Sequence, residues 1–300
     1  MIYQLAAIGA GICFALSPFF SMQAVKELGP TKFNRFRMSI VFVMLLMIAI
    51  ANSSLTTELL DWWLLIAASS LIGIFLGDTL LFFGLKRIGP RRNSVVFALN
   101  APLTVLLGWL FLEESLSFYA LLGTFTITTG VIIAIAFGRR TPSLHEFDSI
   151  NGKLIVGVSI TLGSALCQAV SLILIRPAME AGVDSVSASM LRSGIAALCL
   201  WILAYVNLIR SSKAPTPTPK LTLRTFINIA ISGFLAMGLG MSLLLFGLKG
   251  GETGIISTLS SISPIAALPI LWIVMKKRPA ANAWIGAVFV VSGTSMLFLL

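Results

Sequence analysis

The sequence has little charge. Only 11% of its 300 residues are Asp, Glu, Lys or Arg, while 57% are hydrophobic. A typical soluble domain contains about 25% charged residues, so a soluble globular protein is excluded. Intrinsic disorder is excluded as well, because it requires low hydrophobicity. The class that remains is a membrane protein that crosses the bilayer several times.

Histidine and cysteine are also scarce. The one histidine, His145, lies in a polar stretch without potential partner ligands nearby, and Cys13, Cys167 and Cys199 all lie in apolar segments. An odd number of cysteines in such surroundings argues against a disulfide framework. One histidine and no paired acids leave no acid–base machinery. We therefore expect no enzyme, no cofactor and no metal site.

Apolar runs of about 20 residues, the length that spans a bilayer as a helix, account for most of the chain. Runs such as 40–51 do not alternate polar and apolar residues as β-barrel strands do, so the fold class predicted is an all-α polytopic membrane protein. No basic region precedes the first run, which we therefore expect to be retained. The ten expected transmembrane helices are 2–25, 33–51, 62–85, 93–112, 116–137, 153–175, 186–208, 226–248, 254–275 and 280–299.

Basic residues gather in the odd-numbered connections between these spans, which contain all but three of the 21 Lys and Arg. Such residues flank spans mainly on the cytoplasmic side. We therefore expect a multi-pass protein of the cell (inner) membrane with odd-numbered loops in the cytoplasm and both termini outside. The formal net charge of +10 is then explained by the basic residues of the cytoplasmic loops, which orient the protein in the membrane. It does not indicate a nucleic-acid partner, which would need a basic face.

The two halves of the chain contain the same motifs in the same order. LLFFGLK at 80–86 recurs as LLLFGLK at 243–249, and the order of the other matches indicates an internal repeat. We assign 1–138 to a first repeat of five spans, 139–152 to a linker and 153–300 to a second repeat. The other matched residues are Cys13 with Cys167, Arg37 with Arg192, Pro102 with Pro264, Gly123 with Gly286 and Gly130 with Gly293.

Because each repeat has an odd number of spans, the second enters the membrane from the opposite side. Inverted repeats are typical of secondary transporters, whose substrate site lies near the midplane where the repeats meet. We therefore expect alternating access between the repeats. The alternatives from another class are a channel, which needs a continuous polar pore lining, and a structural membrane subunit, which needs no inverted repeat.

The segment GDTLLFFGLKRIGPRRNSVVFALNAPLTVLLGWLFLEESLS (77–117) resembles the EamA-type members of the drug/metabolite transporter superfamily. The shared features are Gly-Leu-Lys at the end of span 3, a proline in span 4 and a glutamate that closes it. The second half departs from this pattern, with Met275–Lys276 in place of Glu113–Glu114.

This resemblance implies a ten-helix exporter or exchanger of small metabolites, often amino acids, driven by protons or by exchange. A carrier of lipid- or sugar-linked metabolites with a related fold is the alternative. The partners expected are a small-molecule substrate, the lipid bilayer and, where transport is coupled, protons, but no nucleic acid. Both a monomer and a homodimer are compatible with the sequence.

Among the charged residues within the expected spans, Asp78, Arg37 and Arg192 are singled out, because charge inside a span is costly and marks a functional or pairing position. Asp78 is predicted either to couple transport to protons or bind a substrate ammonium, or to pair with a nearby basic side chain. Arg37 and Arg192 could gate the pathway or bind a substrate carboxylate through several donors. The more common behaviour, which we expect here, is snorkelling to the lipid headgroups.

Neutral polar and aromatic side chains at mid-depth in spans 1, 4, 6 and 9 are the candidates for lining a substrate cavity. Such a lining suits a zwitterionic or weakly polar ligand, although polar contacts between helices explain it equally well. Pro102 and Pro264 are expected to kink the fourth and ninth spans. The cavity candidates are Phe14, Ser17, Phe97, Asn100, Trp109, Gln168, Ser171, Ser263 and Trp272.

Overall fold

The computed structural model describes residues 1–55, 57–114, 117–136, 153–210, 221–263, 265–266, 269 and 281–298. Helices make up almost all of these residues, and no β-strand occurs among them. This arrangement is the one a bilayer demands, because a helix satisfies its backbone hydrogen bonds within one segment. The expected linker 139–152, which includes His145, lies outside the described residues.

The first half forms a series of helices joined by short connections. Gly29 separates the first two with φ of 77°, a conformation that favours glycine. A π-helical stretch, η1, continues directly into the helices on either side of it. In chain order the elements are α1 (Ile2–Leu28), α2 (Pro30–Ala51), α3 (Glu58–Asp61), α4 (Trp63–Ser69), η1 (Ser70–Asp78), α5 (Thr79–Phe97), α6 (Asn100–Leu112) and α7 (Phe118–Ala136).

The second half follows the same plan, including a second π-helical stretch, η3, in its third segment. π-Helices are rare and frequently occur at functional sites, so their presence at corresponding places in both halves supports the repeat. The elements are α8 (Leu154–Glu180), α9 (Ser185–Arg210), α10 (Leu223–Gly233), η3 (Phe234–Gly240), α11 (Met241–Leu248), α12 (Thr253–Ser260) and α14 (Ala281–Phe298).

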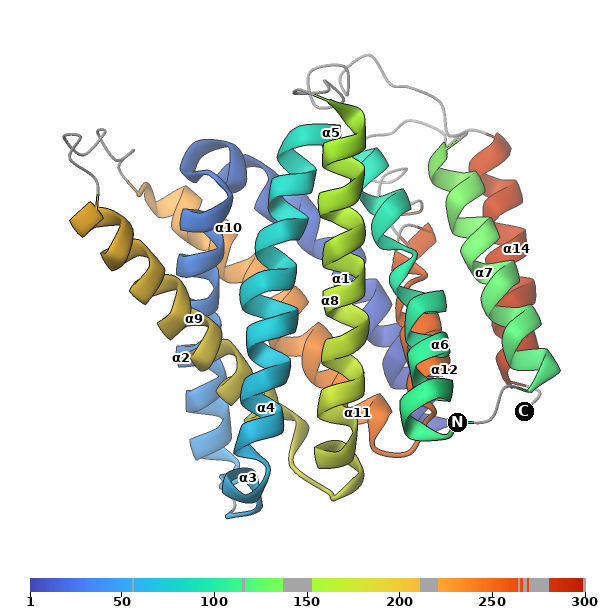
Figure 1. The fold of residues 1–300 in the computed structure, drawn as a ribbon, viewed down its shortest axis with the longest axis horizontal. Helices are drawn as coiled ribbons and strands as arrows, with labels where there is room; N and C mark the ends of the chain where they lie inside the picture. The colour runs from blue at the N-terminus through green and yellow to red at the C-terminus, as the bar shows by residue number, and fades with distance from the viewer. Residues whose placement is uncertain are drawn as a thin grey trace.

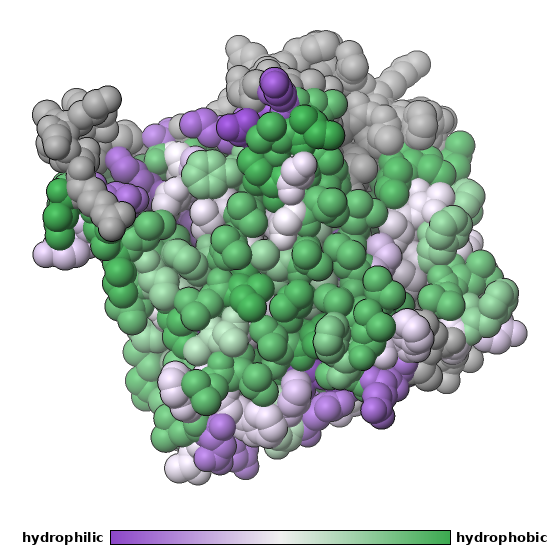
Figure 2. Space-filling model, viewed as in Figure 1, coloured by the Kyte–Doolittle hydropathy of each residue, from purple (hydrophilic) through white to green (hydrophobic). Residues whose placement is uncertain are grey.

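An apolar band crosses the face of the molecule seen in Figure 2. Figure 2 shows hydrophobic side chains across the middle of the visible face and hydrophilic ones at its upper and lower edges. Three further apolar helices are shorter, at Asn100–Leu112, Phe118–Ile133 and Trp284–Gly293. Among the described residues, six stretches are long and apolar enough to cross a membrane: Ile2–Ser21, Pro30–Ala51, Trp63–Ile88, Leu154–Glu180, Ser185–Ile209 and Leu223–Leu248.

The two halves run in opposite directions through this band. In Figure 1 both chain termini lie at the lower edge, and α1 runs from that edge towards the upper one. The corresponding helix of the second half, α8, begins at the upper edge and runs down. The C-terminal ends of α1, α7 and α9 lie at the upper edge.

The boundary between the third and fourth spans differs from the sequence expectation. The third span was expected to end at residue 85, but α5 continues to Phe97, and α6 begins only at Asn100. Lys and Arg are good helix formers, so a basic stretch at a membrane edge does not have to end a helix. Pro102 consequently lies in the first turn of α6, where proline costs no hydrogen bond, so it does not kink α6 itself. The expected fourth span, 93–112, is instead interrupted just before this proline, at residues 98–99 between α5 and α6.

The fourth span ends in contact with the second half. Glu113 takes a left-handed conformation with φ of 54° and closes α6. The carboxylate of Glu114 then accepts hydrogen bonds from the backbone N–H groups of Thr253, at 2.5 Å, and Gly254, at 3.1 Å. These are free donors at the positive end of α12, where a carboxylate is favourable. Glu114, which follows the residue that closes α6, thus joins the two halves at the lower edge.

The halves interdigitate. The first helix of each half packs against the third segment of the other half: α1 contacts α10, η3 and α11, and α8 contacts α4, η1 and α5. α2 packs against α9, and α7 against α14. Small residues allow close approach between helices in a bilayer, as at Ala7 and Ala10 of α1 and Ala165 and Ala169 of α8, all with no exposed surface.

The contact between α7 and α14 predicts a matched pair of glycine variants. A Cβ at Gly130 would lie 2.7 Å from the carbonyl oxygen of Gly286 and 2.7 Å from Cβ of Phe289. We expect Gly130→Ala to lower the free energy of unfolding by about 1–3 kcal/mol, the cost of overpacking. Gly163→Ala, whose new Cβ would meet only Leu80 Cδ1 at 3.6 Å, should not destabilise. Thermal denaturation in detergent checks both, and equal losses would contradict the packing described.

Candidate substrate cavity

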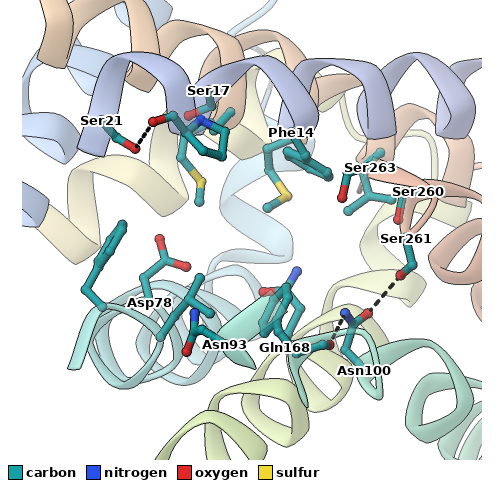
Figure 3. Close-up of a pocket in the computed structure, with 18 of the residues that line it drawn as sticks. Phe14, Ser17, Ser21, Asp78, Asn93, Asn100, Gln168, Ser260, Ser261 and Ser263 are labelled. Atoms are coloured by element: carbon teal, nitrogen blue, oxygen red, sulfur yellow. Dashed lines mark hydrogen bonds between the residues drawn. The ribbon is translucent and has the colours of Figure 1, made fainter. Parts of the chain in front are cut away.

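A cavity of about 260 Å³ lies between the two halves of the chain. Figure 3 shows α1 along one side of it, with Asp78, Asn93, Gln168 and Asn100 on the other side. Helices from both halves form the wall, which places the cavity where the repeats meet. Of the residues singled out from the sequence, those on the wall are Phe14, Ser17, Arg37, Asp78, Phe97, Asn100, Gln168 and Ser263.

Most of the wall is apolar, and its polar groups are mainly neutral. Serine hydroxyls and the amides of Asn93, Asn100 and Gln168 face a lining that includes Phe14 and Phe97. A largely apolar pocket with a few placed polar groups is the usual form of a small-molecule site. The volume suits a small metabolite.

The charged part of the wall is an ion pair. Arg37 Nη2 lies 2.5 Å from Asp78 Oδ2, and the two residues expose only 4% and 6% of their surface. Arg37 also donates to Asn34 Oδ1 at 3.2 Å. Its guanidinium carbon lies 5.5 Å from the ring centre of Phe33 and 4.9 Å from that of Phe82, within range of a cation–π contact.

The second buried arginine lies close to this pair. Arg192 is fully buried, and its Nη2 donates to Ser171 Oγ at 2.8 Å. Its backbone carbonyl accepts a hydrogen bond from Ser70 Oγ of η1 at 2.5 Å. Among the described residues, Nε and Nη1 of Arg192 have no hydrogen-bond partner. The side chain therefore lies at the interface of the halves with unused donors.

The burial of both arginines tests whether their side chains reach the lipid headgroups. The snorkelling expected for Arg37 and Arg192 is wrong, because both guanidinium groups are buried inside the bundle. A buried arginine requires a counter-charge or several acceptors, and Asp78 supplies the counter-charge for Arg37. The pairing of Asp78 with a basic side chain is one of the two interpretations that the sequence left open.

Repeat-related serines form repeat-related hydrogen bonds. Ser17 of α1 donates to the carbonyl oxygen of Ser232 at 2.9 Å, and Ser171 of α8 donates to that of Ser69 at 2.9 Å. Ser17 and Ser171 occupy equivalent positions in the two repeats, and so do Ser69 and Ser232. Each bond fastens the first helix of one half to the third segment of the other.

A polar cluster joins α6 and α12 at the side of the cavity. Asn100 donates from Nδ2 to the Phe97 carbonyl at 2.7 Å, and its Oδ1 lies 3.2 Å from the hydroxyl of Ser257. Ser261 Oγ is also within 3.5 Å of the same amide oxygen, as Figure 3 shows. Asn100 is thus held in place by both halves while it faces the cavity.

The remaining candidates lie elsewhere or cannot be placed. Ser171 is fully buried beside the cavity, held by Ser69 and Arg192. Trp109 is 48% exposed on the outer surface. Trp272 and Pro264 lie outside the described residues.

The sequence reasoning missed several wall residues. Pro18 stands inside α1 and lines the cavity. A proline in the interior of a helix removes a backbone hydrogen bond. Its position inside an expected span could therefore have marked Pro18 as a candidate from the sequence. Asn93 was placed at the start of the fourth span, but it lies in α5 and accepts a hydrogen bond from Thr161 at 2.7 Å. The other missed polar residues of the wall are Ser21, Ser260 and Ser261.

No metal-binding constellation accompanies the cavity. In the part of the chain that the structure describes, no group of three or more His, Cys, Asp or Glu side chains lies close enough to hold an ion. The groups available to a ligand are thus hydroxyls, amides, aromatic rings and one ion pair.

The fold and this cavity define a helical membrane protein with an internal repeat and a site between its halves. The EamA-like transporter family matches the chain twice, at residues 1–136 and 155–299. The chain belongs to this family, and it is a membrane transporter of the drug/metabolite type.

Solved structures show the same fold. A crystal structure of another protein superimposes with a TM-score of 0.77 at 16% sequence identity, over 99% of this chain and 96% of that one. At this level of identity, the likeness shows the fold alone. No curated protein matches the sequence.

The repeat-related serines predict unequal effects of the same substitution. Ser17→Ala removes a hydrogen bond to one carbonyl, so we expect a loss of about 1 kcal/mol in the free energy of unfolding. Ser171→Ala removes the bond to Ser69 and also leaves Arg192 without its hydroxyl acceptor. We expect a loss of about 2–3 kcal/mol, because bonds to charged groups are stronger. Chemical denaturation in detergent measures both, and a larger loss for Ser17→Ala would contradict the assignment.

Proposed function

We propose that the chain is a secondary-active exporter of small zwitterionic metabolites such as amino acids. Ten transmembrane helices form two inverted repeats, 1–138 and 153–300, joined by the linker 139–152, and access to the cavity alternates between the repeats. The observation that carries the proposal is the cavity between two halves of opposite direction, with a buried ion pair in its wall. Secondary transporters with inverted repeats bind substrate at this place.

The chemistry of the wall supports a zwitterionic substrate. A molecule with an ammonium and a carboxylate group can bind between Asp78 and Arg37, whose charges are adjacent. Neutral amides such as that of Gln168 add hydrogen bonds without adding charge. The aromatic and aliphatic part of the wall suits an apolar side chain on the substrate.

The positions of the cavity and of the basic residues support the proposed direction of transport. The wall includes Ser21 of α1, which lies seven residues before Leu28, where this helix ends at the edge opposite the termini. In the sequence, most Lys and Arg fall in the odd-numbered connections, beginning with the one after α1, and such residues favour the cytoplasmic side. We therefore propose a cell (inner) membrane location with extracytoplasmic termini and a cavity loaded from the cytoplasm.

The alternatives are less well supported. A channel requires a continuous polar pore, whereas the wall here is mostly apolar. A structural subunit has no use for a cavity between inverted halves. A carrier of lipid- or sugar-linked metabolites would need room beyond about 260 Å³ for its substrate.

Counterflow in proteoliposomes tests the function. Purified protein is reconstituted and assayed with radiolabelled amino acids and nucleosides, with and without a pH gradient. We expect counterflow of at least one amino acid. Acceleration of net uptake by the gradient would identify protons as the driving force, and its absence would identify exchange. No counterflow across the whole panel with folded, monodisperse protein would contradict the proposal.

An acid variant tests the role of the charged wall. Asp78→Asn removes the buried carboxylate and leaves Arg37 without its counter-charge, so we expect counterflow to fall at least tenfold. Asp61→Asn is the matched control, because Asp61 is exposed in α3. Loss of gradient-driven uptake alone would assign proton coupling to Asp78. Unchanged transport in both assays would exclude a role for this carboxylate.

A further inference from the structure

Two buried arginines compete for one buried carboxylate. Arg37 and Arg192 are repeat-equivalent, but the position equivalent to Asp78 in the second half is Met241. Met241 lines the cavity, as Asp78 does. The symmetry of the fold therefore provides two places for an ion pair, while the sequence provides a single acid to fill them.

Arg192 lies against the helix that carries Asp78. A Cβ at Gly73 of η1 would lie 3.4 Å from Nη2 of Arg192, so the guanidinium touches η1 at this point. In a π-helix the hydrogen bonds join residues five apart, so Gly73 and Asp78 lie on the same face of η1. Arg192 is consequently about one helical turn from the carboxylate, within its electrostatic range.

The spare donors of Arg192 are the second observation. Its Nε and Nη1 are buried and have no partner among the described residues, and it has no acid partner there. Nε of Arg37 also lacks a partner, but Nη2 of Arg37 donates to both Asp78 and Asn34. An uncompensated buried charge is costly. A movement of η1 and α5 past α9 by one turn would bring Asp78 to the free donors of Arg192. Arg37 would then be the arginine without a carboxylate partner. One-turn shifts between packed helices are an established kind of switching transition.

We propose that Asp78 changes partner from Arg37 to its repeat-equivalent Arg192 when access to the cavity passes from one edge of the protein to the other. Without substrate, each end state contains one ion pair of Asp78, and therefore one paired and one unpaired arginine. The two states are therefore close in energy, as a transporter requires, since a large gap would populate only one of them. This inference rests on the alternating access proposed above.

Two repeat-equivalent positions report which edge is open. Ser21 of α1 lines the cavity, whereas its counterpart in α8, Ile175, has no exposed surface. After exchange of the two repeats' conformations, position 175 should line the cavity and position 21 should be buried. The probes are Ser21→Cys and Ile175→Cys, each in a protein whose three native cysteines are replaced by alanine. Their labelling rates are measured with a membrane-impermeant thiol reagent added to each side of proteoliposomes.

The arginine variants should shift these rates in opposite directions. Arg37→Met leaves Arg192 as the partner of Asp78, so we expect Ile175→Cys to be labelled at least threefold faster and Ser21→Cys at least threefold slower. Arg192→Met should do the reverse. Arg35→Met is the matched control, because Arg35 is on the same helix but stacks on Trp201 at 4.4 Å. It should change neither rate by more than twofold.

The outcomes separate this inference from the proposed function. If Ile175→Cys is never labelled in any folded variant, alternating access itself is contradicted. If it is labelled, but Arg37→Met and Arg192→Met shift the rates in the same direction or leave them unchanged, the partner exchange is overturned. Arg37→Lys and Arg192→Lys guard against misfolding, because they keep the charge. Their labelling rates should stay within threefold of those of the parent protein. Monodisperse elution verifies the fold of every variant.

Discussion

The contact on which the rest of the structure depends is the packing of each half's first helix against the third segment of the other half. Ser17 and Ser171 fasten this contact at equivalent places through hydrogen bonds to the Ser232 and Ser69 carbonyls. Neither half can form its core alone, because its first helix is buried in its twin. The cavity exists where these crossed contacts leave space, so its position follows from the repeat.

The charges at the centre can be understood from the same geometry. Arg37, Asp78 and Arg192 are each at least nine-tenths buried, and the charges of these side chains add to a net +1. Such a group is costly in a bilayer unless it pairs, and only Arg37 is paired here. The free-energy cost of burying an unpaired arginine indicates that these charges have a role other than stabilising the fold. A well-packed apolar cluster at the same place would give a protein at least as stable.

The sequence predicted the helices and the repeat well, because both depend on local apolar runs and on ordered motifs. It did not predict the partner of Asp78, since residues 41 positions apart in the chain are brought together only by packing. Arg37 was expected at the headgroups for the same reason. Pro102 was misjudged because the start of α6 depends on how α5 ends. The π-helices left no pattern in the sequence that distinguishes them from α-helices.

The central claim is that the edge bearing the termini opens during transport. At this edge the hydroxyls of Ser54, after α2, and Ser187, in the first turn of α9, lie 2.9 Å apart and join the two halves. Cysteines at both positions, in a protein without its native cysteines, can be oxidised to a disulfide. With the cross-link verified by mass spectrometry, counterflow should stop and should return on reduction. Counterflow at the full rate in the cross-linked protein would contradict the account.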